Sequence, residues 1–517
     1  MIKRIFRYSV YILLFFNLIL MSPALFAESS SSGSSPGAEL QKVEDYVFDG
    51  EDRFGDPKQS LTDPGSLQKT RSGKFNLIGA VKNTFLSVGK TIKGLESKFN
   101  NFNNDIVKRT KSGLKGLQKK VDGILHNIDE FLFPSSYADE IFPLSEEARD
   151  MVSWMRNSQN SKTGLVSSYE GESTEHTGSG YTYDQSLAVM AFMVSGEVKR
   201  ARRILDFYMD QIREKKLNHN GFINGYDATE GYGIEYKVHS GPNAWIGMAA
   251  LQYVRQTGQK QYLKIAEQAG DFLIEMMDPE GGVKGGPEEK WYSTEHNLDA
   301  YAFFKQMYEY TGNEKYNLHN KVKGWLMENS FVNFDNCLIT RGKRDVSPAT
   351  DVYSWAIAAL GPRELYLMLV DPDEVIAFAI KRFEVQTEFK NPDGSTYKVT
   401  GFDFTIPSNM GRKGIVSGEW TAQMIGTLKI MAGHYEGKDF KKFQYYDEKA
   451  RFYETELSKM KIGDALPYAS KANEQTGHGW RTPRGENLQA LSSTAYYVLS
   501  SAGYNPFTGE PLTHPVQ

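Results

Sequence analysis

The chain has 517 residues, of which 40% are hydrophobic and 24% charged, and its formal net charge is −4. These values are typical of a globular protein with a large core, and the slight acidity gives no case for a nucleic-acid-binding protein. The single cysteine, Cys337, excludes an intrachain disulfide and argues against thiol catalysis.

Residues 1–27 have the pattern of a secretory signal peptide. Lys3 and Arg4 give it a basic start, an apolar stretch follows over 10–20, and Ala27 is a small residue at the expected cleavage point. An uncleaved anchor helix is the alternative, although the apolar stretch is short for a membrane span. We therefore predict a bacterial protein that is exported, periplasmic or secreted, with a cleaved signal peptide.

Two further segments precede the main domain. Residues 28–70 are rich in serine, aspartate, glycine and proline, which predicts a disordered linker. Over 71–135, apolar residues recur at alternating steps of three and four, as in a heptad stripe, and basic residues crowd the opposite face. Three interpretations stay open for this basic amphipathic helical segment: a hairpin packed on itself or on the main domain, a coiled-coil oligomer, or a helix on an anionic membrane surface. The partners predicted for residues 74–131 are therefore a membrane surface or a second copy of the chain.

From residue 141 to about 505 the chain alternates between two kinds of predicted helix. One kind is apolar on a single face, which is typical of a helix that covers a core. Six such outer helices are expected near 144–157, 197–213, 261–277, 315–328, 373–386 and 440–459. The other kind is apolar on nearly every side, which is typical of a buried helix. Six such inner helices are expected near 182–195, 242–256, 295–311, 351–369, 418–433 and 487–502.

This alternation predicts an all-α fold, an (α/α)6 toroid of six helical hairpins over 141–505, followed by a short tail over 506–517. The fourth inner helix should be kinked or divided by Gly361-Pro362. The links from inner to outer helices are short, whereas the links from outer to inner helices are long. The long links are 158–181, 214–241, 278–294, 329–350, 387–417 and 460–486. They should gather at the N-terminal ends of the inner helices, where long loops are more often functional than idle.

The starts of the inner helices carry most of the polar and aromatic residues that could bind a ligand. Aromatic rings offer flat faces to the C–H surfaces of sugars, while carboxylates, amides and imidazoles bond the hydroxyl groups. The predicted substrate-binding residues are Tyr183, Trp245, Trp291, His296, Asp299, Asp351, Trp355, Trp420, His478 and Trp480. The alternative is structural, since acids also cap helices and tryptophans also fill the wide end of a barrel.

Some of these stretches resemble a known superfamily. Residues 183–188 read Tyr-Asp-Gln-Ser-Leu-Ala and residues 241–245 read Gly-Pro-Asn-Ala-Trp, and each is followed by a short Gly-containing link. With the hairpin repeat, they make residues 141–505 similar to six-hairpin (α/α)6 carbohydrate-active proteins. That superfamily includes glycoside hydrolases, unsaturated-uronyl hydrolases, some polysaccharide lyases and sugar epimerases. The catalytic signature of a single family is not matched, so the resemblance implies a fold and a substrate class but carries over no catalytic residue.

Several carboxylates around one cleft permit acid–base chemistry on a glycosidic bond. Glu295 is the predicted general acid, because it lies between Trp291 and His296 in the sequence. Asp184 or Glu419 is the predicted partner base. The leading hypothesis is therefore an exported carbohydrate-active enzyme, a glycoside hydrolase that acts on an oligo- or polysaccharide.

Two other functions stay open. A lyase or epimerase would use His296 or His478 with Tyr183 to abstract a proton, and a non-catalytic toroid would bind a glycan or a protein. We predict no cofactor and no metal site. Four histidines could converge on the loop face, but their spacing matches no zinc signature, and calcium on loop carboxylates stays open. These four are His176, His239, His296 and His478.

Overall fold

A computed structural model of the protein describes residues 142–171, 176–331, 338–485 and 488–512. The chain divides into two compact units, 1–81 and 82–517, and all the described residues belong to the second. The predicted signal peptide, the linker and the basic segment over 71–135 lie outside the described residues, as do residues 513–517 of the tail. Those predictions therefore stay predictions.

Six helices form an inner ring. They are α8 (Thr182–Val194), α10 (Ser240–Thr257), α12 (Thr294–Thr311), α14 (Asp351–Leu360), α17 (Gly418–Tyr435) and α19 (Leu491–Ser501). Each packs against the next in this order, and α19 packs against α8, so the ring closes on itself. Nearly every residue of α8 and α14 is buried. The all-round apolar pattern thus predicted these buried helices correctly.

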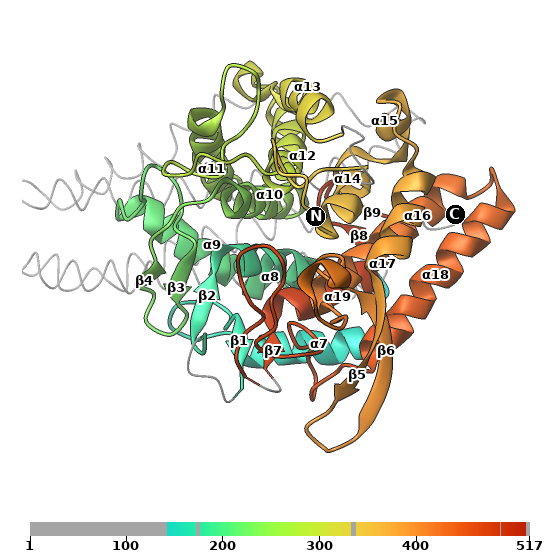
Figure 1. Cartoon of the computed structure of the whole chain (residues 1–517). Helices are drawn as coiled ribbons and strands as arrows, with labels where there is room; N and C mark the ends of the chain where they lie inside the picture. Colours follow the sequence, from blue (N-terminus) through green and yellow to red (C-terminus); the bar gives the residue numbers. More distant parts are fainter. Residues whose placement is uncertain (1–141, 172–175, 332–337, 486–487, 513–517) are drawn as a thin grey trace, which may run out of the picture. The chain divides into compact units, whose positions relative to one another are not determined.

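Six helices cover the ring from outside. They are α7 (Glu146–Asn157), α9 (Val198–Arg213), α11 (Leu263–Met276), α13 (His319–Asn329), α16 (Pro372–Phe383) and α18 (Phe440–Ser458). In chain order from α9 each packs on the inner helix before it, and α7 packs on α19 (Figure 1). In α9 the buried residues Ala201, Ile204, Leu205 and Tyr208 lie three to four positions apart, as expected for a one-sided helix. The fold is therefore the predicted (α/α)6 toroid.

The predicted break in the fourth inner helix is present. Gly361 has a positive φ of 81°, and the short helix α15 (Pro362–Leu367) begins at the proline. Glycine adopts this conformation without a steric cost, and proline fits the first turn of the helix that follows.

The long links carry short strands, and one prediction fails here. Strands β5 (Glu384–Lys390) and β6 (Thr396–Phe402) form an antiparallel hairpin. The link predicted over 387–417 therefore contains strands and is not only a loop. The fifth outer helix ends at Phe383, so its predicted extension to residue 386 is wrong. The stretch does alternate polar and apolar residues, and Asp393-Gly394 is a typical turn pair, with Gly394 at a φ of 88°. The other strands are β1 (Tyr169–Glu170), β2 (Ser179–Tyr181), β3 (Gly225–Asp227), β4 (Gly233–Glu235), β7 (Gln489–Ala490), β8 (Tyr504–Asn505) and β9 (Glu510–Pro511).

Neighbouring long links are joined in a cycle. Strand β2 pairs with β3 and β1 pairs with β7, which joins the first link to the second and to the start of the sixth inner helix. Backbone hydrogen bonds or bridges make the remaining joins. They are Ser240–Gly285, Ser293–Gly342, Thr350–Phe404 and Ser417–Ala469. The long links therefore gather at one end of the ring, as predicted. Among the described residues, the helices are all too short or too polar to cross a membrane.

Candidate functional site

Four carboxylates lie in the first turns of four inner helices. Asp184 belongs to α8, Glu295 to α12, Asp351 to α14 and Glu419 to α17. Ser293 caps α12 by accepting from the His296 amide at 3.0 Å, and Ser417 caps α17 by accepting from the Trp420 amide at 3.2 Å. Because serines supply these caps, Glu295 and Glu419 are not needed as helix caps.

Glu295 and Asp351 form a coupled pair. Their side chains share a hydrogen bond, and burial together with the neighbouring carboxylates raises the pKa of Glu295 well above its usual range. Burial also raises the pKa of Asp351, to about 7, although the Val352 amide donates to its Oδ1 at 2.9 Å and Arg341 lies nearby. Two carboxylates this close cannot both ionise easily, so the pair retains a proton near neutral pH.

Glu419 lies close to this pair, but its carboxylate accepts a different set of hydrogen bonds. The Tyr183 hydroxyl donates to its Oε1 at 2.6 Å, and the Gln423 amide donates to the same oxygen at 2.9 Å. Burial raises the pKa of Glu419, while the hydrogen bonds from Tyr183, Ser492 and Gln423 oppose that shift. Donors of this kind stabilise the ionised form, which suits a base or nucleophile. Glu295 and Glu419 are thus close enough for the charge of Glu419 to raise the pKa of Glu295.

Asp184 is buried beside the same group. Burial raises its pKa to about 8, a hydrogen bond from Ser168 opposes the shift, and the charge of Glu419 adds to it. Asp184 is therefore largely protonated at neutral pH. Its predicted role as partner base is weaker than that of Glu419, because a neutral acid cannot accept a proton.

An aromatic floor lies beneath the carboxylates, and here the structure corrects three predicted substrate contacts. Trp245 has no exposed surface, Trp355 is 2% exposed and Asp299 is 1% exposed. The Trp245 indole donates to Asp299 Oδ1 at 2.9 Å and packs against Trp355, with ring centroids 5.4 Å apart. Phe507 contacts both indoles from the C-terminal end of the chain. These three residues pack together and expose almost no surface to a ligand.

The histidines lie in separate places. His296 Nδ1 shares a hydrogen bond with Ser240 Oγ at 2.9 Å. Burial lowers the pKa of His296 to about 3. His239 packs beside it, whereas His176 contacts Tyr181. His478 bonds the Phe404 carbonyl through Nε2 at 2.9 Å, and burial lowers its pKa to about 4. The four histidines do not converge, and within the described ranges three or more His, Cys, Asp or Glu side chains nowhere gather as metal ligands.

Aromatic residues flank the carboxylates on two sides. On one side Trp291 is 41% exposed and contacts both His239 and His296. On the other side Trp420 is 7% exposed and packs between Phe404 and His478. Trp480 lies over His478 and is 41% exposed. Trp291 and Trp480 therefore have an accessible surface, whereas the side chain of Trp420 is almost fully buried.

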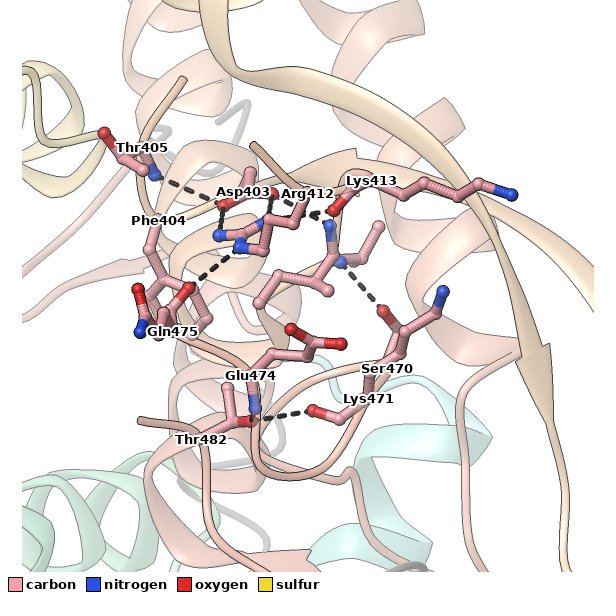
Figure 2. Close-up of polar contacts among 12 residues, drawn as sticks. Asp403, Phe404, Thr405, Arg412, Lys413, Ser470, Lys471, Glu474, Gln475 and Thr482 are labelled. Atoms are coloured by element: carbon pink, nitrogen blue, oxygen red, sulfur yellow. Dashed lines mark hydrogen bonds and ion pairs between the residues drawn. The ribbon is translucent and has the colours of Figure 1, made fainter. Parts of the chain in front are cut away.

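Asp403 and Arg412 form a buried ion pair that the sequence analysis did not single out. Asp403 has no exposed surface, and the guanidinium donates to both of its oxygens at 2.7 Å (Figure 2). Arg412 also donates to the Gln475 carbonyl at 2.8 Å, while the Ile415 amide donates to the carboxylate at 2.8 Å. The pair therefore ties residues 403–415 to the last long link. An aspartate and an arginine nine residues apart in a loop carry no local signal for such a bond.

Three further residues lie near the carboxylates and were not predicted from the sequence: Arg341, Tyr468 and Tyr496. Arg341 is the cation whose charge lowers the pKa of both Glu295 and Asp351. Tyr468 stacks on Phe404 with centroids 5.6 Å apart. Each comes from a loop or a buried helix face, where the sequence offered no pattern that distinguished them.

Similarity to known proteins is found at the level of structure. No protein-family model matches the chain, and no curated protein matches it. Similar solved structures include the α-1,6-mannanase GH76A of Salegentibacter sp. HEL1_6, in an inactive variant bound to α-1,6-mannotriose. It is 12% identical, with 70% of this chain and 98% of the mannanase covered and a TM-score of 0.46. A glycosidase variant in complex with glucose is 11% identical over 71% of this chain and 97% of its own, with a TM-score of 0.48. Cellobiose 2-epimerase from Bacillus thermoamylovorans B4167 is 12% identical over 71% and 99%, with a TM-score of 0.47. The closed ring of helical hairpins confirms the fold that the resemblance to six-hairpin toroid proteins predicted.

Proposed function

We propose that the protein is an exported glycoside hydrolase that cleaves an oligo- or polysaccharide. The observation that carries this proposal is the Glu295–Asp351 pair, which shares a hydrogen bond close to the Tyr183-bound Glu419. A glycosidic bond breaks when its oxygen receives a proton while a carboxylate acts at the anomeric carbon or on a water beside it.

The two requirements fall on different residues. Glu295 holds a proton near neutral pH and can give it to the leaving oxygen, because burial and Asp351 disfavour its ionised form. We assign the role of base or nucleophile to Glu419, because hydrogen bonds from three donors oppose the rise in its pKa that burial causes. Arg341 limits the excess of negative charge. By contrast, the Tyr183 hydroxyl is engaged with Glu419, which leaves it poorly placed for the alternative proton abstraction by a tyrosine–histidine pair.

The test is product analysis on a panel of oligosaccharides with the full mature chain. The panel should hold gluco-, manno-, xylo- and galacto-oligosaccharides, with α-1,6-linked mannans and cello-oligosaccharides among them. Glu295→Gln should lower turnover by ~10²–10⁴-fold while leaving the melting temperature unchanged, because it removes a general acid and keeps its shape. Glu267→Gln, on the exposed face of α11, is the matched control and should behave as the wild type. Near-native hydrolysis by the Glu295 variant would overturn the assignment.

The pH profile provides a second readout. Activity should fall as the pH rises and the Glu295–Asp351 pair loses its shared proton. Asp351→Asn removes a negative charge beside Glu295, so the pKa of Glu295 should fall and the alkaline limb should move to lower pH. An unmoved limb would show that Glu295 is not the acid.

A further inference from the structure

A cavity of about 270 Å³ lies between the second and third long links. The residues that line it include Asn218, Tyr236, Lys237, His239, Glu288 and Glu289. The proposed reaction does not use any of these residues. The exposed ring of Tyr236 lines this cavity, and the exposed ring of Trp291 contacts two of the lining residues, His239 and Glu289. The way in which these two rings are held indicates what the cavity binds.

The Trp291 indole lies flat on backbone. A Cβ atom placed on Gly285 would be 2.3 to 2.5 Å from three atoms of the benzo ring, so the glycine lies directly under the face of that ring. The indole N–H donates to Glu289 Oε2 at 2.6 Å, which fixes the rotation of the ring. One face is therefore seated on the chain, while 41% of the side chain stays exposed.

Tyr236 is held in a similar way. A Cβ atom on Gly233 would lie 2.9 Å from two atoms of the Tyr236 ring, and the side chain is 64% exposed. The Tyr236 carbonyl accepts from the Asn218 amide at 2.8 Å, which anchors the backbone at the mouth of the cavity. Two exposed rings beside one cavity with polar groups form a candidate surface for a ligand.

The charges around the cavity favour a neutral ligand. Glu288 and Glu289 are acidic, and Lys237 is the matching cation, with its Nζ 3.9 Å from Glu289 Oε1. His239 lies 3.5 Å from the same oxygen, but burial lowers its pKa, so it is neutral at pH 7. Two carboxylates against one ammonium would repel an anionic sugar. Hydroxyl groups could instead bond to the carboxylates, to Asn218 and to Lys237.

Trp291 links residues that line the cavity to helix α12, which carries Glu295. The indole centroid is 5.2 Å from the ring of His296, the residue after Glu295, and 5.8 Å from the ring of His239. We propose that Trp291, Tyr236 and this cavity form a distal subsite for a neutral sugar unit, so that the substrate is an uncharged oligosaccharide of several units bound along a groove. This proposal rests on the proposed function and narrows its substrate class.

The test is the dependence of binding on chain length. The probes are cellobiose, cellohexaose, α-1,6-mannobiose and α-1,6-mannohexaose, titrated calorimetrically into the Glu295→Gln chain so that they are not consumed. Trp291→Ala and Tyr236→Ala should each weaken binding of a hexaose by ~10-fold and leave binding of the disaccharide unchanged, because only the longer ligand reaches the subsite. Tyr445→Ala, an exposed tyrosine of the outer helix α18, is the matched control and should change neither.

The outcomes separate this inference from the proposed function. Equal losses for both lengths, or no loss for the hexaose, would overturn the subsite even if the wild type cleaves oligosaccharides. If hydrolysis is not detected but the hexaose binds and loses affinity in both variants, the subsite stands and the catalytic proposal falls. If none of the four probes binds, a subsite for neutral sugars is refuted. Melting temperatures of the variants within a degree or two of the parent would exclude unfolding as the cause, and Trp291→Phe should restore part of the lost affinity.

Discussion

The two aromatic regions beside the carboxylates are built in opposite ways. The Trp291 surface, made of Tyr236, His239, Glu289 and Trp291, has exposed rings that rest on glycines. The Arg412 cluster, made of Asp403, Phe404, Arg412, Trp420 and His478, has buried rings held by an ion pair. The same residue types therefore serve two purposes. Exposed rings on a firm support can receive a ligand, whereas buried rings can only hold a shape.

The Arg412 cluster holds the starts of two helices that carry carboxylates of the candidate site, α14 and α17. The Asp403 carbonyl accepts from Thr350 Oγ1, and the Phe404 carbonyl accepts from the Thr350 amide at 3.2 Å, directly before Asp351. The Phe402 carbonyl accepts from the Ser417 amide at 2.9 Å, two residues before Glu419. Loops 403–415 and 470–482 thus position the starts of α14 and α17, while the Trp291 surface makes no such connection to them.

The largest effect on stability should come from breaking the ion pair. Arg412→Met leaves the Asp403 charge buried without a partner and should cost about 3–5 kcal/mol of unfolding free energy, measured by urea denaturation. Arg451→Met is the matched control, because Arg451 pairs with Asp447 on the exposed face of α18, and should cost less than about 1 kcal/mol. Similar losses in the two variants would contradict the structural role assigned to Asp403.

Truncating a ring in each region should sharpen the contrast. Trp420→Ala and Trp355→Ala remove buried side chains and should each cost about 3–5 kcal/mol. Trp291→Ala removes a half-exposed ring and should cost about 1 kcal/mol or less, although it should weaken ligand binding. Thermal melts with and without a hexaose separate loss of stability from loss of ligand binding. A Trp291 variant as unstable as the Trp420 variant would contradict the proposed difference between the two regions.

Another effect should appear in the pH dependence of stability. The pKa of Asp184 is raised from 3.8 to about 8 in the folded chain, so the native state binds a proton that the unfolded state releases. Its contribution therefore favours folding at low pH and is lost as the pH rises from about 4 to about 8. Asp184→Asn should match the wild type in melting temperature at pH 4.5 and exceed it at pH 8. Equal melting temperatures at both pH values would show that Asp184 is not buried as an acid.

The smallest effect is expected from removing the chain before residue 136, which lies outside the described residues. The inner ring closes and is covered by outer helices of the described residues alone. A mature chain that begins at residue 136 should therefore keep its melting transition and its catalysis. It should lose self-association or attachment to anionic vesicles, and added salt should weaken that attachment in the longer chain because charges are screened within about 10 Å at 0.1 M. Sedimentation with and without vesicles measures this. Loss of cooperative melting would show that residues 74–131 contribute to the core.

Local patterns in the sequence determined the helices of this protein and their order. Consecutive residues show whether a helix is apolar on one side or on every side, because buried positions repeat with the period of the helix. The break at Gly361-Pro362 and the gathering of the long links at one end follow from equally local rules. Glu295 and Glu419 could be singled out for the same reason, because both stand in first turns of predicted buried helices.

Tertiary structure alone decided which of these residues can act. Trp245 and Trp291 both stand at inner-helix starts, yet one is fully buried and the other lies exposed on Gly285. The bond between Asp403 and Arg412 depends on how a loop folds over the last long link. The proton shared by Glu295 and Asp351 depends on two helices that are more than 50 residues apart in the chain. Exposure, ion pairing and pKa are set by neighbours in space, and those neighbours are assembled only when the ring closes.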